Sequence, residues 1–297
     1  MKFLRKRISC LIAAVLMAAV VLMPLSAEAS DTPDQTAETA VLPANPRLSY
    51  NAGSCRRLEG KPYVVVIYLD DDVSNWTEEE VKFHQENLIN PGLAFIEENA
   101  KKWGVFLDIG VGYYTTYGYP DRPMKYEGVV DSHNSGTTSK DILDQVARIL
   151  GHDSKRAMHD ALTKYAGTEQ VAYMIMLDKG GISYSIAHYK PEEPVDQQYW
   201  MEYSVVFSGF TDTSRDSASD TIVHELLHVF GAEDYYLPES RKALARQYCL
   251  TDIMLCNESD LQYFTLGEFT AYTLGWTDEI PEVCYMEGWW KKDPDNQ

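Results

Sequence analysis

Residues 221–236 constrain this chain more than any other stretch. They carry His224, Glu225 and His228 among apolar neighbours, namely Ile222, Val223, Leu226, Leu227, Val229 and Phe230. In a helix, residues four apart share a face, so both imidazoles can reach one metal ion. The apolar neighbours predict a buried helix, where unpaired polar side chains would be costly and a metal would supply their partners. We therefore predict a metal-carrying helix at the floor of a cleft.

A third protein ligand has to be found, because a tetrahedral catalytic zinc site takes three of them and a water. Gly231 follows His228 by three residues, and a glycine there can take the left-handed conformation that ends a helix and reverses the chain. The returning chain brings Asp234 to the metal. Glu233, which should face away if Asp234 faces in, and the more distant Glu258 are the alternatives. We prefer Asp234 because the glycine explains its spacing.

Glu225 directly follows the first histidine and points to the side, where a metal-bound water would lie. Two neutral nitrogen ligands and a nearby carboxylate base are the parts that zinc-assisted hydrolysis needs. The stretch therefore points to hydrolytic chemistry with Zn²⁺ as cofactor.

The rest of the chain predicts a mixed α+β fold, with strands before and between helices, and with helices dominating after residue 219. Apolar runs, continuous or alternating, predict strands over 63–69, 105–113, 171–177, 182–189 and 203–207. Helical patterns cover 77–102, 139–150, 154–165, 241–248 and 266–274.

Local signals define several of these helix ends. Thr77 with Glu80 forms a capping-box pattern, and Asn90-Pro91-Gly92 should break or kink the helix that follows. Ser139 and Ser154 are expected caps. For the helix of the histidine motif we expect Ser219 or Asp220 as the cap.

The N-terminus has the pattern of a secretory signal at 1–29, with a basic start, an apolar centre and an Ala27-Glu28-Ala29 cleavage site. An uncleaved anchor helix is the alternative. Residues 30–47 are polar and proline-bearing and predict a linker or a disordered arm, and 48–297 are long enough for one sizeable domain. The net charge of −19 argues against nucleic acid and anionic membrane surfaces as partners.

Cleavage of the signal would leave four cysteines, Cys55, Cys249, Cys256 and Cys284. An even count in a secreted chain favours two disulfides, with three possible connectivities. A Cys249–Cys256 bond would brace the turn at 252–254, and Cys55–Cys284 would tie the start of the domain to its end. Buried free thiols are the alternative.

The motif His224-Glu225-x-x-His228-x-x-Gly231-x-x-Asp234 resembles the extended zinc motif of metzincin-type metallopeptidases. Its aspartate in the third position is similar to the snapalysin-like and immune-inhibitor-A-like secreted peptidases. Asp252-Ile253-Met254 stands where the methionine turn of that clan is expected, and Gly275-Trp276 resembles the segment that follows it.

The resemblance implies a zincin-like (metzincin-type) catalytic domain over 48–297, with a mixed β-sheet over an active-site helix and a helical C-terminal part. It implies a secreted zinc endopeptidase with His224, His228 and Asp234 as ligands and Glu225 as general base. Tyr235 and Tyr236 are candidate oxyanion donors, and the substrate would lie along strand 182–189.

The expected partner is a protein or peptide substrate, with no stable membrane association once the signal is removed. Two other functions stay open: a secreted binding protein that keeps the fold without turnover, and a zinc hydrolase acting on non-peptide amides. The oligomeric state is open as well.

Overall fold

The computed structural model describes residues 53–55, 57–118, 121–132, 141–187, 201–209, 219–236, 239–255 and 260–279. All of them belong to one compact unit, Leu42–Gln297. The predicted signal peptide at 1–29 and the linker at 30–47 lie outside the described residues. Within the described part of the chain, no helix is both long enough and apolar enough to cross a membrane.

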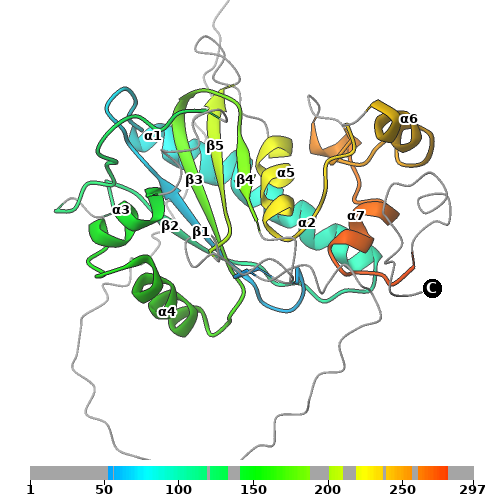
Figure 1. The fold of residues 1–297 in the computed structure, drawn as a ribbon, viewed down its shortest axis with the longest axis horizontal. Coiled ribbons are helices and arrows are strands. Elements are labelled where there is room, and N and C mark those ends of the chain that lie inside the picture. Colours follow the sequence, from blue (N-terminus) through cyan, green and yellow to red (C-terminus); the bar gives the residue numbers. More distant parts are fainter. Residues whose placement is uncertain are drawn as a thin grey trace, which may run out of the picture. The chain divides into compact units, whose positions relative to one another are not determined.

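Five strands of the described residues form one mostly parallel sheet in the order β2-β1-β3-β5-β4 (Figure 1). They are β1 (Tyr63–Tyr68), β2 (Gly110–Tyr114), β3 (Val171–Gly180), β4 (Tyr184–Ile186) and β5 (Tyr203–Gly209). β4 is antiparallel to β5, and the other pairs are parallel. Parallel strands covered on both faces need apolar side chains on both, which is why the continuous apolar runs became β1, β3 and β5.

Helices cover both faces of the sheet. The helices of the described residues are α1 (Glu78–His84), the π-helical η2 (Gln85–Ile89), α2 (Asn90–Lys102), α3 (Ile142–Ile149), α4 (Lys155–Ala166), α5 (Ser219–Val229), α6 (Glu239–Tyr248), the 3₁₀ turn η4 (Leu261–Tyr263) and α7 (Glu268–Thr273). Alternation along β1 divides the core: Val64 and Val66 belong to the apolar cluster that includes residues of α2, α5 and α7, whereas Val65 and Ile67 belong to the cluster that includes residues of α3 and α4. The mixed α+β class predicted from the sequence is confirmed.

The long helical stretch 77–102 differs in one respect from its prediction. Thr77 and Glu80 form the expected capping box. The helix does not break at Asn90-Pro91-Gly92, because Pro91 lies in the first turn of α2, where its missing N–H is tolerated. The irregularity is the π-helical turn just before it, where the Asn90 N–H reaches the Gln85 carbonyl.

Three other helix starts can be compared with their predictions. Ser154 caps α4 by accepting a hydrogen bond from the Ala157 N–H, as predicted. The cap of α3 is Asp141, so the expectation of Ser139, which lies outside the described residues, is wrong. α5 already includes Ser219, so neither Ser219 nor Asp220 precedes its first turn.

Two of the four cysteines belong to the described residues, and both are buried. Cys55 and Cys249 are not bonded to each other, which excludes the connectivity that would join them. The Cys55 thiol donates a hydrogen bond to the Val171 carbonyl. Cys256 and Cys284 lie outside the described residues, so the pairings Cys249–Cys256 and Cys55–Cys284 stay predictions.

Candidate metal centre

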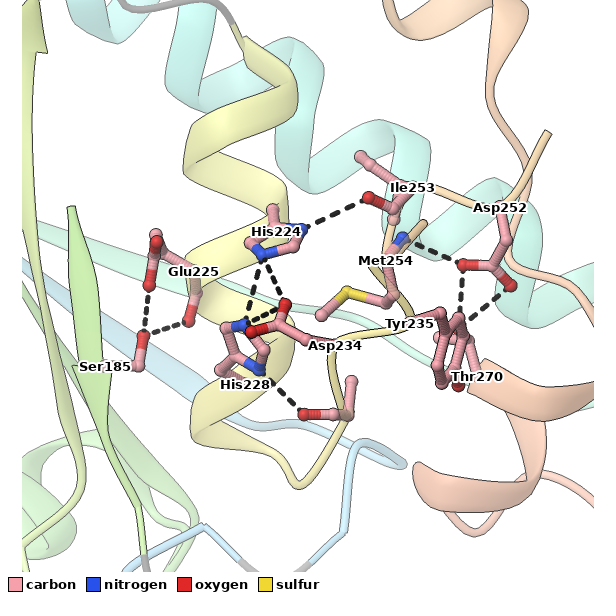
Figure 2. A network of polar contacts seen from close by, with 11 residues as sticks. Ser185, His224, Glu225, His228, Asp234, Tyr235, Asp252, Ile253, Met254 and Thr270 are labelled. Atoms are coloured by element: carbon pink, nitrogen blue, oxygen red, sulfur yellow. Dashed lines mark hydrogen bonds and ion pairs between the residues drawn. The ribbon is translucent and has the colours of Figure 1, made fainter. Parts of the chain in front are cut away.

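Helix α5 packs on β4 and β5 and against α2, and its composition sets which face is buried. Leu226 and Leu227 are completely buried, and Ile222 and Val223 nearly so. His224 and His228 lie one turn apart, as predicted, and each side chain keeps 12% of its surface exposed. The apolar face thus fixes the helix while both imidazoles remain within reach of solvent. Figure 2 shows both rings on the same side of α5.

The chain turns back sharply after α5. Gly231 has a φ of 99°, in the region that side chains other than glycine rarely adopt, and its N–H bonds to the His228 carbonyl. This reversal brings Asp234 back to the histidines. Asp234 Oδ1 lies 3.1 Å from His224 Nε2 and 3.1 Å from His228 Nε2, and the two Nε2 atoms are 3.1 Å apart. Three potential ligand atoms therefore form a nearly equilateral triangle.

Backbone carbonyls hold both rings from behind. His224 Nδ1 donates to the Ile253 carbonyl at 3.1 Å, and His228 Nδ1 donates to the Ala232 carbonyl at 2.8 Å. Because each Nδ1 carries the proton, each neutral ring presents the lone pair of Nε2 to the triangle. An outer partner of this kind orients metal-binding histidines and fixes their tautomer.

The triangle concentrates electron pairs that repel one another unless a cation lies among them. Burial alone would lower the pKa of His224, but the hydrogen bond to Asp234 and the negative charges of Glu225 and Asp234 raise it to about 9. Burial would raise the pKa of Asp234, but hydrogen bonds from His224 and His228 outweigh it and hold that pKa well below its usual range. The metal-free centre therefore attracts a positive charge.

The three atoms suit a small divalent cation. Atoms about 2.0–2.1 Å from a tetrahedral zinc ion are separated by about 3.3–3.4 Å, close to the 3.1 Å observed here. Two imidazole nitrogens and one carboxylate oxygen are a donor set that zinc accepts in catalytic sites. The residues present thus fit the metal expected from the sequence, although other divalent transition metals accept the same donors.

Glu225 points toward strand β4, away from the side of α5 on which Asp234 lies (Figure 2). Its side chain is largely buried. The Ser185 hydroxyl, from the middle of β4, lies 2.7 Å from Glu225 Oε2 and 2.8 Å from the Glu225 backbone oxygen. A carboxylate therefore stands beside the histidine pair, between the helix and the antiparallel strand.

The turn at 252–254 supports the centre from the other side. Asp252 is fully buried and accepts hydrogen bonds from the Met254 and Gly267 N–H groups and from the Thr270 hydroxyl. These bonds hold the turn whose Ile253 carbonyl receives His224. Met254 is also fully buried, and Figure 2 shows its side chain running toward the imidazole pair.

The two tyrosines after Asp234 have different surroundings. Tyr235 is fully buried, with its hydroxyl 3.2 Å from Thr270 Oγ1, so it lies away from the triangle and is no candidate oxyanion donor. The Tyr236 ring stacks on His224 with centroids 6.2 Å apart. Burial, followed by the charge of Asp234 and a hydrogen bond to it, raises the pKa of Tyr236. Of the pair, only Tyr236 reaches the centre.

Of the two alternatives for the third ligand, Glu233 belongs to the described residues and Glu258 does not. Glu233 is half-buried and does not belong to the group formed by His224, His228 and Asp234. Sequence reasoning missed Ser185. The alternation of the predicted strand was the available signal, since it sets Ser185 on the face opposite to Tyr184 and Ile186.

A comparison with models of known protein families finds no match, and a search of curated protein sequences finds none either.

Proposed function

We propose that the protein is a secreted zinc-dependent endopeptidase. The observation that carries the proposal is the triangle of His224 Nε2, His228 Nε2 and Asp234 Oδ1, each pair 3.1 Å apart, with Glu225 beside it. Metal ligands and a carboxylate base in one partly open site are the combination that hydrolysis of an amide requires.

Zinc held by His224, His228 and Asp234 would supply a water whose pKa is lowered toward neutrality and would polarise the scissile carbonyl. Glu225 accepts a proton from the attacking water at its carboxylate and passes it to the leaving amine. The Ile253 and Ala232 carbonyls keep both imidazoles oriented while this happens. Tyr236 is the candidate donor to the developing oxyanion, which would require its hydroxyl to turn from Asp234.

Strand β4 is the proposed site for an extended substrate. It pairs with β5 along one edge, and no strand of the described residues pairs with its other edge. An extended peptide can add to such an edge through main-chain hydrogen bonds. Ser185 joins β4 to Glu225, so a peptide held there would run beside the proposed base.

The position of α5 in the fold is compatible with this function. We propose that residues 48–297 form a zincin-like, metzincin-type domain, with α5 as the active-site helix and Met254 in the methionine turn. Two features support this: the antiparallel strand β4 lies at the sheet edge beside α5, and the turn at 252–254 bonds to the first histidine of the motif. Secretion is proposed from the signal pattern at 1–29.

The test uses the full chain, expressed with its leader so that the natural N-terminus forms. We expect one zinc per chain by metal analysis. We also expect chelator-sensitive cleavage of a peptide library, read by mass spectrometry, which reports the preferred sequence as well. Glu225→Gln should abolish cleavage and keep the zinc, whereas Asp234→Ala should lose the zinc. Glu233→Ala is the matched control and should change neither.

Four outcomes would contradict the proposal in different ways. Stoichiometric zinc without cleavage of any peptide would favour a binding protein, and cleavage confined to non-peptide amides would favour the other hydrolase. A Glu225→Gln variant with full activity would refute the role of Glu225. Retention of zinc in Asp234→Ala but not in Glu258→Ala would move the third ligand to Glu258.

A further inference from the structure

Strand β4 presents different chemistry on its two faces. Tyr184 and Ile186 pack on the hydrophobic cluster that includes α3 and α4. Ser185, between them, faces α5 and pairs with Ser204 of β5 in the antiparallel register. A helix–strand interface would ordinarily be filled by an apolar side chain, so a hydroxyl at this position calls for a partner.

That partner is Glu225. The Ser185 oxygen lies 2.7 Å from Glu225 Oε2, and among the described residues Ser185 is the one hydrogen-bond donor to that carboxylate. A second acceptor, the Glu225 backbone oxygen, lies 2.8 Å away. A serine hydroxyl has a single hydrogen, so it serves one acceptor at a time, and the charged carboxylate is the stronger one.

The contact restricts a side chain that would otherwise have rotational freedom. A glutamate has three side-chain torsions, and holding it in one arrangement has an entropic cost that a charge-assisted hydrogen bond can offset. Ser185 comes from a strand pinned by β5, so its hydroxyl is a rigid reference point. When the carboxylate moves, the backbone oxygen remains as an acceptor, so the serine need not be left unpaired.

We propose that Ser185 is a positioning residue that holds the Glu225 carboxylate in its working orientation beside the metal ligands. This inference rests on the proposed peptidase function. It also links two parts of that function, because the strand proposed to pair with the substrate carries the group that orients the base. Displacement of β4 would then misplace peptide and base together.

The experiment compares Ser185→Ala with Ser185→Thr and with Ser183→Ala in the full chain. Ser183 is the matched control, since its hydroxyl accepts a hydrogen bond from the Phe207 N–H rather than bonding to a residue of the candidate metal centre. We expect Ser185→Ala to lower kcat about tenfold or more with little change in KM or zinc content, because a hydrogen bond to a charged group is lost. Ser185→Thr keeps the hydroxyl and should restore most of kcat.

A second measurement needs no turnover. Thermal unfolding of the metal-free wild type, Ser185→Ala, Glu225→Ala and the double variant forms a double-mutant cycle. If the contact exists, the loss of Tm in the double variant will be smaller than the two single losses added together. Additive losses would overturn the contact, and an unchanged kcat in Ser185→Ala would overturn its role.

The two proposals fail in distinguishable ways. A wild-type protein that binds zinc but cleaves nothing overturns both the peptidase function and the positioning role, while a non-additive cycle would still establish the Ser185–Glu225 contact. An active wild type whose Ser185→Ala variant keeps its kcat overturns the positioning role alone. Equal loss of kcat and zinc in Ser185→Ala and Ser183→Ala would reduce Ser185 to a general structural role and overturn the proposal.

Discussion

Replacement of Asp252 by alanine should destabilise the protein, and by an amount that depends on pH. The Asp252 carboxylate has no exposed surface and satisfies three donors, the Met254 and Gly267 N–H groups and the Thr270 hydroxyl, at 2.8–2.9 Å. Removing it strands the two N–H groups, whereas the Thr270 hydroxyl can still donate to the Tyr235 oxygen 3.2 Å away. Each stranded donor costs about 1–3 kcal/mol, so the total cost is about 2–6 kcal/mol.

An opposing contribution reduces this cost at neutral pH. Burial raises the pKa of Asp252 from its ordinary value of 3.8 to about 6, even though the hydrogen bonds lower it. That difference corresponds to about 3 kcal/mol of unfavourable free energy for the ionised group at pH 7. The net cost of Asp252→Ala at pH 7 is therefore at most about 3 kcal/mol. Since the raised pKa makes wild-type stability greater below pH 6, the cost should grow by about 2 kcal/mol at pH 4.5.

Urea denaturation of the chelator-treated protein at pH 7 and pH 4.5 measures both quantities. Asp108→Ala is the control, because Asp108 is exposed and its ion pair with Lys61 should contribute little. Zinc affinity should also weaken about 10–100-fold in Asp252→Ala, because the Ile253 carbonyl that orients His224 loses its support. A cost at pH 4.5 no greater than that of Asp108→Ala, or a cost that does not grow as the pH falls, would refute the reasoning.

Three further perturbations follow from the described residues. Gly231→Ala should cost about 1–3 kcal/mol in urea denaturation, because φ is 99°, and should weaken zinc binding by calorimetry; wild-type affinity would contradict the role of the reversal. Ser154→Ala should lose about 1 kcal/mol of thermal stability with activity unchanged, since α4 loses its cap. Burial lowers the pKa values of His84 and His159 to about 4, so both stay neutral when folded. Because the unfolded protein binds these protons near pH 6.5 and the folded protein does not, the free energy of unfolding falls from pH 6.5 toward pH 4, by up to about 3 kcal/mol for each histidine. A His84→Phe/His159→Phe variant whose stability in urea keeps the wild-type pH profile would oppose this.

Much of the fold could be predicted because its signals are local. The apolar runs that became β1, β3 and β5, and the Ser154 cap, act within one element. The break expected at Pro91 did not occur, because Pro91 lies in the first turn of α2, directly after a π-helical turn. Phe83 is apolar and yet 55% exposed, since tertiary packing determines which face of a helix is covered.

The candidate centre likewise contains some contacts that could be predicted from the sequence and others that could not. His224, His228 and Asp234 are close in sequence, and helical spacing with one glycine was enough to predict that they meet. The Ser185–Glu225 bond joins residues 40 apart, and the support of His224 by Ile253 joins residues 29 apart. Such pairings depend on how the strand and the later turn dock against α5, which periodicity alone does not specify.

The two histidines differ in how far along the chain their supporting carbonyls lie. Ala232 is four residues from His228, but Ile253 is 29 residues from His224. A local opening that undocks the turn at 252–254 would release the His224 ring and would also break the hydrogen bond from the Tyr235 N–H to the Met254 carbonyl, next to Asp234, while leaving the His228 ring supported. The C-terminal part would then govern how tightly the metal is held rather than whether it is held. Hydrogen exchange at the Met254 amide should therefore slow on addition of zinc. Unchanged exchange would mean that docking of the turn and binding of the metal are not coupled.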